Sequence, residues 1–179
     1  MTVSDTDKNF RPASIAVLVA VLVWWVLAGK FVLDFAYCIY DDAYIYFRYA
    51  DNFFGGCPFR YNCGDPPVEG FTSPLYLGLL VLGRAFYADL ETLSQVYGLL
   101  LWGSAVTVGF VTFSRNFFGE QRWLIAAAAL AFAGVCGTDD YLLLGMVSGM
   151  EGGVVALVIA LIVWAALEER HNWLRALVV

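Results

Sequence analysis

The hydrophobic and polar positions of this chain alternate on the scale of whole segments. Four long stretches contain no Asp, Glu, Lys or Arg, and they are residues 12–29, 92–114, 123–138 and 152–167. A helix that crosses a membrane needs about 20 apolar residues, with a range of roughly 17–25. The first two stretches meet this length, and the last two meet it when neighbouring residues are added. The pattern predicts an all-α, polytopic membrane helix bundle with about four spans, at residues 12–33, 92–114, 123–138 and 152–167.

A fifth apolar stretch, residues 70–83, is shorter and is followed by Arg84. We expect it to form a juxtamembrane helix that lies in the membrane interface or against the protein. A fifth span is the alternative for this stretch. For residues 12–29 the alternative is a cleaved signal peptide, but the long apolar run and the spans that follow favour a signal anchor.

The basic residues predict the orientation, because Lys and Arg are enriched on the cytoplasmic side of membrane proteins. Lys8 and Arg11 precede the first span, which predicts a cytoplasmic N-terminus. With four spans, Arg115 and Arg122 also lie inside, and residues 34–91 form an external loop with juxtamembrane helices. We therefore expect a multi-pass protein of the inner (plasma) membrane with its site on the external, periplasmic side.

Composition narrows the class of protein further. Of the 179 residues, 61% are hydrophobic and 15% are charged, and the net charge is −6. Soluble domains carry about 25% charged residues. These values exclude a disordered chain and an ordinary soluble domain, and the negative charge argues against a nucleic-acid partner. The expected surroundings are a lipid bilayer.

A polar and aromatic segment follows the first span. We expect a helix that begins with Asp41 as its N-cap and ends before Gly55. At about 100° per residue, two faces of this helix carry polar groups. The first face holds Asp41, Tyr44, Ile45, Arg48 and Asn52, and the second holds Asp42, Tyr46, Tyr49 and Phe53. Carboxylates near the membrane are costly unless solvated or paired, which indicates a site. The alternative is an interfacial helix with its acids in water and its rings in the aromatic belt.

Two cysteines lie close together in the external loop. An oxidising compartment would allow a disulfide between Cys57 and Cys63, and two unpaired thiols are the alternative. A zinc site is not expected, because the single histidine, His171, falls on the other side of the membrane.

The chain resembles a known family in three segments. They read DDAYIYFRYADNFF from Asp41, FRYNCGDPPVEGFTSPLY from Phe59, and SGME from Ser148. In order and spacing they resemble the pattern of bacterial GT-C glycosyltransferases, which use polyprenyl-phosphate sugars, and are nearest to the terminal arabinofuranosyltransferases of mycobacterial cell walls. The resemblance covers about residues 40–153 and implies that this chain is the N-terminal part of a longer enzyme.

The resemblance implies roles for individual residues. Asp41 is the expected general base for the acceptor hydroxyl, and Asp42 is its alternative or a ligand of the sugar. Arg48 and Asn52 are expected at the donor phosphate. The expected ligands of the sugar or acceptor are Tyr44, Glu69, Thr72, Ser73 and Glu151. A divalent metal is possible for such enzymes and is not required.

Plainer interpretations stay open beside these roles. Arg48 can pair with Asp41 or Asp51 along its own helix. The Thr72-Ser73-Pro74 run also reads as an N-cap followed by proline at the first helical position. Alternatives for the whole chain are a non-catalytic membrane protein, a truncated fragment or, less favoured, a transporter.

The family pattern is departed from at several positions. Asp65 and Pro66 stand where the family has Glu and a polar residue, and Phe71, Met150 and Gly152 replace Tyr, Leu and Thr. Gly145 and Gly149, four positions apart, are expected to allow close helix packing rather than to form a phosphate loop.

Overall fold

The computed structural model describes residues 5–35, 38–117 and 140–176, so the span expected at residues 123–138 lies outside the described residues. Within the described ranges every regular element is a helix, which confirms the all-α class for them. The helices are α1 (Asp5–Asp34), α2 (Ala43–Phe54), α3 (Pro74–Arg84), α4 (Leu90–Phe117), α6 (Asp140–Val147) and α7 (Gly152–Ala176).

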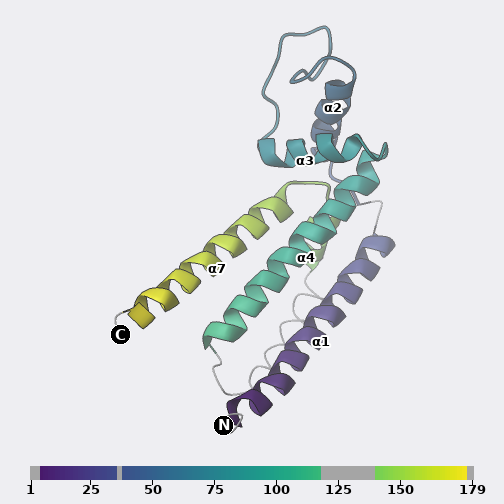
Figure 1. Cartoon of the computed structure of the whole chain (residues 1–179). Coiled ribbons are helices and arrows are strands. Elements are labelled where there is room, and N and C mark those ends of the chain that lie inside the picture. Colours follow the sequence, from purple (N-terminus) through teal and green to yellow (C-terminus); the bar gives the residue numbers. More distant parts are fainter. Residues whose placement is uncertain (1–4, 36–37, 118–139, 177–179) are drawn as a thin grey trace.

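The long helices form one layer, and the short helices α2 and α3 sit at one end of it (Figure 1). Helix α4 lies at the centre and packs against α1, α3, α6 and α7. Helices α2 and α3, together with the loop of residues 55–73, form a structure that we call the head. Helix α1 begins and α7 ends at the opposite end of the molecule (Figure 1).

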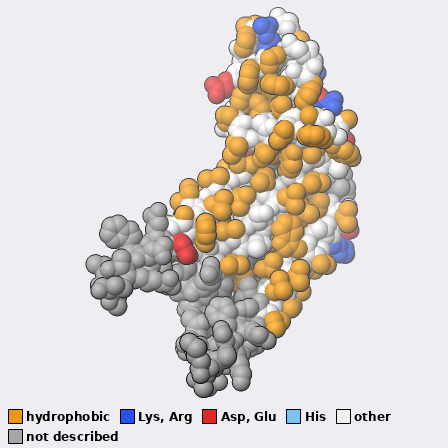
Figure 2. Space-filling view, viewed as in Figure 1, with side chains coloured by type: hydrophobic (Ala, Val, Ile, Leu, Met, Phe, Trp, Pro, Cys, Tyr) orange, Lys and Arg blue, Asp and Glu red, His pale blue; other side chains and the backbone are white. Residues whose placement is uncertain are grey.

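One segment of the described chain, Leu90–Phe113, is long and apolar enough to cross a membrane by length and composition, and the apolar helices Pro74–Arg84 and Gly152–Glu168 are shorter. Figure 2 shows hydrophobic side chains over the long helices, with charged side chains on the head and near the helix ends. Val26 on α1 is 71% exposed and Ile162 on α7 is 62% exposed. Large contiguous apolar patches are rare on the surface of monomeric soluble proteins.

Small residues bring the central helices together. An added Cβ at Gly98 of α4 would lie 1.9 Å from the Met146 carbonyl oxygen of α6. At Gly103 it would meet the Trp25 ring of α1 at 2.3 Å. Trp25 also donates a hydrogen bond from Nε1 to Thr107 Oγ1 at 3.2 Å. Close approach at glycine is how membrane helices gain packing contacts without a hydrophobic driving force.

Helix α3 begins as the sequence predicted. Ser73 is its N-cap and accepts a hydrogen bond from Tyr76 N at 3.3 Å, and Pro74 occupies the first helical position. The helix has 11 residues. At about 1.5 Å per residue it is roughly 16 Å long, about half the thickness of a hydrocarbon core.

Helix α2 begins later than the sequence predicted. Its N-cap is Asp42, so the expectation of Asp41 at this position is wrong by one residue. Asp42 has φ −65° and ψ −23° and makes no side-chain capping bond. A capping side chain normally needs extended backbone at that position, and here the backbone is already helical. The predicted end is confirmed, since Gly55 follows the helix and Gly56 has φ +81°.

Candidate functional site

The polar side chains of α2 hold the loop of the head. Asn52 Nδ2 donates hydrogen bonds to the carbonyl oxygens of Arg60 and Tyr61, both at 2.8 Å. Arg48 Nε donates to the same Tyr61 oxygen at 3.1 Å. Asn52 is buried and Arg48 is exposed. The two side chains expected at a phosphate therefore converge on loop backbone, and the guanidinium remains at the surface.

Two tyrosines of α2 continue this pattern along the loop. Tyr49 donates from its hydroxyl to Val68 O at 2.7 Å. The Tyr46 hydroxyl accepts from Thr72 N at 3.2 Å and from Ser73 N at 3.0 Å. Residues nearer the start of α2 thus bind residues further along the loop. Side chains of α2 therefore hold the loop in place by hydrogen bonds to the main-chain atoms of the loop.

A disulfide closes part of the same loop. Cys57 and Cys63 are joined, with 5.3 Å between their Cα atoms, and they are six positions apart in sequence. This separation lies within the usual range for disulfides, about 4.4–6.8 Å. The covalent bond and the hydrogen bonds from α2 constrain the loop together.

The loop reaches the start of α7 through Thr72. Its hydroxyl donates to Glu151 Oε1 at 2.5 Å, although the two residues are 79 positions apart in sequence. The same hydroxyl lies 2.9 Å from the Tyr46 hydroxyl. Two residues expected to line a sugar site, Thr72 and Glu151, are thus in direct contact.

Two further hydrogen bonds tie the turn before α7 to the head. Tyr40 N donates to Ser148 O at 3.0 Å, which brings the start of the acidic motif to this turn. Tyr76 donates from its hydroxyl to Gly149 O at 2.9 Å. Burial raises the pKa of the Tyr76 phenol, and the negative charge of Glu151 raises it further. All three segments that carry the family resemblance therefore meet at one end of the bundle.

A groove of about 510 Å³ opens beside this turn. Its lining includes Trp102 of α4, Glu151, and apolar side chains of α7 such as Val155 and Ile159. Glu151 Oε2 and Trp102 Nε1 are both buried and have no hydrogen-bond partner among the described residues. An acceptor and a donor thus lie unpaired beside an apolar groove. Sequence reasoning missed Trp102, because a tryptophan within a predicted span carries no distinguishing signal.

The acidic pair lies on the exposed side of the head. Asp41 and Asp42 are both exposed. Tyr44 donates from its hydroxyl to Glu91 Oε1 at 2.9 Å. This hydrogen bond raises the pKa of Tyr44, and loss of hydration and the negative charges of Glu91 and Asp41 raise it further. Asp41, Tyr44 and Glu91 therefore share one acidic surface.

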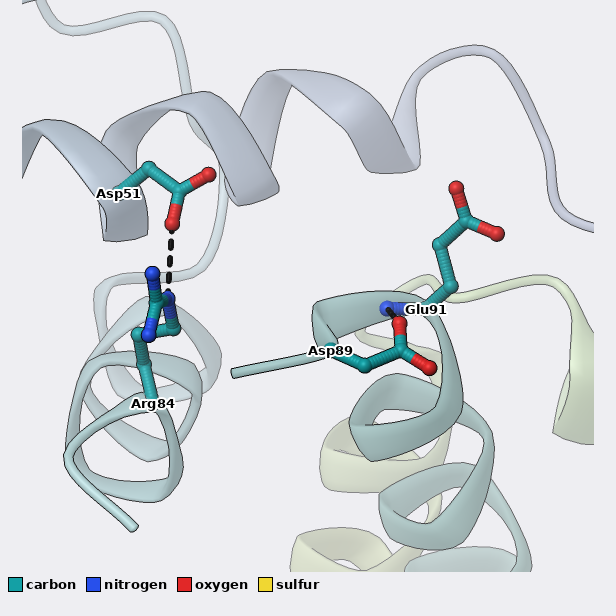
Figure 3. Close-up of polar contacts among 4 residues, drawn as sticks. All are labelled: Asp51, Arg84, Asp89 and Glu91. Carbon is teal, nitrogen blue, oxygen red and sulfur yellow. Dashed lines mark hydrogen bonds and ion pairs between the residues drawn. The ribbon is translucent and has the colours of Figure 1, made fainter. Parts of the chain in front are cut away.

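Other carboxylates, in the head and at the start of α4, are used for structure (Figure 3). Asp51 Oδ1 pairs with Arg84 Nε at 2.8 Å and joins α2 to α3. The sequence had left open that Asp51 pairs with Arg48. Asp89 Oδ1 accepts from Glu91 N at 3.1 Å at the start of α4. In Figure 3 the Glu91 side chain points toward α2, in agreement with its bond to Tyr44. Glu91 was also missed from the sequence, because an acid in the first turn of a helix has an ordinary electrostatic explanation.

The side chains of the remaining residues predicted for the site, Glu69 and Ser73, take little part in the contacts described above. Glu69 is exposed on the loop, and the Ser73 side chain serves as the N-cap of α3. Within the described ranges, no three or more His, Cys, Asp or Glu residues gather in a way that would hold a metal ion. No protein-family model, curated protein or solved structure matches this chain.

Proposed function

We propose that this chain functions in a membrane glycosyltransferase of the GT-C type. It would transfer a sugar, such as arabinofuranose, from a polyprenyl-phosphate donor to an external glycan or glycoconjugate acceptor. The observation that carries the proposal is the meeting of the three motif segments at the head, through the bonds Tyr40–Ser148, Tyr46–Thr72 and Thr72–Glu151. Contact among segments so far apart in sequence supports the proposal that they form one site.

The proposed setting is a bundle of about four spans in the plasma membrane, with the N-terminus in the cytoplasm and the head outside. The exposed apolar side chains of α1 and α7 support contact with lipid. The short helix α3, which is apolar except for Arg84 in its last turn, would lie at the membrane interface. In this setting the groove beside α7 would receive the isoprenoid chain of the donor, and the exposed acids would meet an acceptor from the aqueous side.

The proposed chemistry is a displacement at the anomeric carbon. Asp41 takes the proton of the acceptor hydroxyl as its oxygen forms the new glycosidic bond. The bond between the anomeric carbon and the phosphate oxygen breaks, and polyprenyl monophosphate leaves with both electrons. The exposed Arg48 guanidinium would stabilise the leaving phosphate by charge-assisted hydrogen bonds. Asp42 and Tyr44 would hold sugar hydroxyls beside the base.

The test is transfer of labelled sugar from a polyprenyl phosphate to an acceptor glycan in membranes that contain the protein. Asp41→Asn keeps the size of the side chain and removes the base. We expect a loss of about 10²- to 10⁴-fold in the transfer rate, the usual contribution of a general base. Asp42→Asn should cost less and act mainly on KM.

A matched control is Glu168→Gln, which makes the same chemical change at an exposed position in the C-terminal half of α7, the helix whose end lies opposite the head (Figure 1). It should transfer at the wild-type rate. If Asp42→Asn is inactive while Asp41→Asn is not, the two aspartates exchange roles. If both variants keep full activity, the acidic pair has no catalytic part and the proposal fails.

A further inference from the structure

The hydroxyl of Tyr46 has all of its hydrogen-bonding capacity occupied. The oxygen accepts from two backbone groups, Thr72 N and Ser73 N, at 3.2 and 3.0 Å. A third polar atom, Thr72 Oγ1, lies 2.9 Å away. Because the two N–H groups occupy the acceptor side of the phenol oxygen, its own hydrogen is directed to Thr72 Oγ1. Tyr46 is therefore the donor in that contact.

The direction of the next bond follows. A threonine hydroxyl carries one hydrogen, and Thr72 already receives a hydrogen from Tyr46. Its own hydrogen points to Glu151 Oε1, 2.5 Å away. The hydrogen bonds thus run in one direction, from Tyr46 through Thr72 to the carboxylate.

The first member of this chain is held rigidly. The Tyr46 side chain is 3% exposed, and its ring meets the Tyr76 ring edge to face at 5.2 Å between centroids. Tyr76 in turn binds the Gly149 carbonyl, two residues before Glu151. A rigid donor at the start of the chain fixes the carboxylate at its end.

Only one of the two oxygens of Glu151 is used in this way. Oε2 is buried without a hydrogen-bond partner among the described residues, and Glu151 lines the groove beside α7. A buried acceptor that stays unpaired costs free energy comparable to a lost hydrogen bond. Such an atom calls for an explanation, and a ligand that supplies the missing donor is one.

We propose that Tyr46 is a positioning residue: through Thr72 it holds Glu151 Oε1, so that Oε2 is left to accept a hydrogen bond from a sugar hydroxyl. The identity of the donor as a sugar hydroxyl rests on the proposed glycosyl transfer. The positioning itself does not, and it is tested separately.

The first experiment measures the freedom of Glu151 without any transfer assay. Membranes that contain the protein are treated with a carbodiimide and a small amine, and modification of Glu151 is quantified by mass spectrometry. Thr72→Val removes the hydrogen bond to Oε1, and Tyr46→Phe removes the contact that holds the Thr72 hydroxyl in place. We expect modification to rise in both variants, by about three- to tenfold, the scale of one hydrogen bond. Thr72 is exposed, so its substitution is compatible with folding.

The control is Tyr49→Phe. It removes a hydroxyl from the same helix and a bond of 2.7 Å to the same loop, but it does not touch Thr72. Modification of Glu151 should stay at the wild-type level. If Tyr46→Phe and Thr72→Val also leave it unchanged, or if Tyr49→Phe raises it equally, the positioning role is overturned.

The second experiment is a double-mutant cycle on transfer. Tyr46→Phe alone should lower kcat about tenfold. In the Thr72→Val background the further loss should be much smaller, because the chain to Glu151 is already broken and only the bonds from Thr72 N and Ser73 N to the phenol are still lost. Thr72→Ser keeps the hydroxyl and should retain transfer. Additive losses would overturn the chain. If modification of Glu151 responds as expected and the wild-type protein transfers no sugar, the positioning is supported and the proposed function fails.

Discussion

Gly149 is the residue on which the turn before α7 depends. Its φ is +75°, in the left-handed region that glycine adopts without steric cost. An added Cβ would meet Ala43 Cβ at 2.9 Å and Ser94 Oγ at 3.2 Å. The conformation and the lack of space both require glycine, and the carbonyl of this residue receives the Tyr76 hydroxyl.

Gly149→Ala is therefore expected to destabilise the protein by about 1–3 kcal/mol, the cost of holding a side chain in a sparsely populated backbone region. Thermal unfolding in detergent, followed by circular dichroism, measures the change. Gly78→Ala is the control, because that helical position has open space within 4 Å of an added Cβ. It should be neutral or stabilise by up to about 1 kcal/mol. Equal melting temperatures for the two variants would contradict the role of Gly149.

Single residues also show what the sequence reveals and what it does not. The helical periodicity placed Arg48 and Asn52 on one face, and both do reach the same carbonyl oxygen, that of Tyr61. The partner was not predictable, because a backbone carbonyl belongs to every residue and leaves no mark in the sequence. The helical periodicity likewise placed Tyr46 on the face with Asp42, Tyr49 and Phe53, but it could not show the partners of its hydroxyl. Its bonds go to backbone N–H groups of the loop.

At the scale of elements, the beginning of α4 depends on Asp89. Its side chain accepts from Glu91 N at 3.1 Å and from Thr92 N at 3.4 Å. The hydrogen bond from the Thr92 hydroxyl lowers the pKa of Asp89, and the backbone N–H groups act in the same direction. A lowered pKa in the folded state means that the stabilisation is present above the ordinary value, about pH 4, and is lost as the pH falls through the folded-state pKa.

Asp89→Ala should lower the free energy of unfolding by about 0.5–2 kcal/mol near neutral pH, as for other N-caps. The difference from wild type should shrink below about pH 4, where the carboxylate becomes protonated. Denaturant unfolding in detergent at both pH values provides the measurement. The matched control is Asp42→Ala, at an N-cap that makes no side-chain capping bond. A difference that grows on acidification would contradict the capping role.

The loop of the head is stabilised in two ways, by the disulfide and by the hydrogen bonds from α2, and the two contributions can be measured separately. We expect the Cys57–Cys63 bond in protein from an oxidising compartment, and mass spectrometry without reduction should find the linked peptide. Because the closed loop is short, replacing both cysteines with serine should cost only about 2 kcal/mol. The bonds from α2 should keep the loop in place without the disulfide. Two freely alkylated thiols would contradict the pairing.

The two short helices show how far local signals reach. Pro74 after Ser73 predicted the start of α3 correctly, because both residues act through local geometry. The start of α2 was misplaced because two adjacent aspartates give the same local signal. Tyr40, just before this helix, is held by a hydrogen bond to Ser148, which is 108 positions away in sequence. Such a contact leaves no local signal in the sequence. Element boundaries set by such contacts are found only in three dimensions.

At the scale of the whole molecule, hydrophobic surface and charge are separated along the long axis. Apolar side chains cover the middle of the long helices, and charged side chains lie on the head and near the helix ends (Figure 2). A bilayer would stabilise this arrangement by covering the apolar layer and leaving the head in water. The distribution of Lys and Arg then predicts which side is external.

This orientation predicts that Gly64→Cys, in a background without the four native cysteines, reacts with a membrane-impermeant maleimide in intact cells. Position 64 is exposed on the loop, and an added Cβ there meets nothing within 4 Å. The hydrogen bonds from α2 should hold the loop after the disulfide is removed. Glu168→Cys is the control, because this exposed position of α7 lies beyond the last predicted span, on the side predicted to be cytoplasmic. It should react only after the cells are permeabilised, since the reagent cannot cross the bilayer. The reverse pattern would place the head in the cytoplasm, where no external acceptor glycan reaches it, and the topology and the proposed function would fail together.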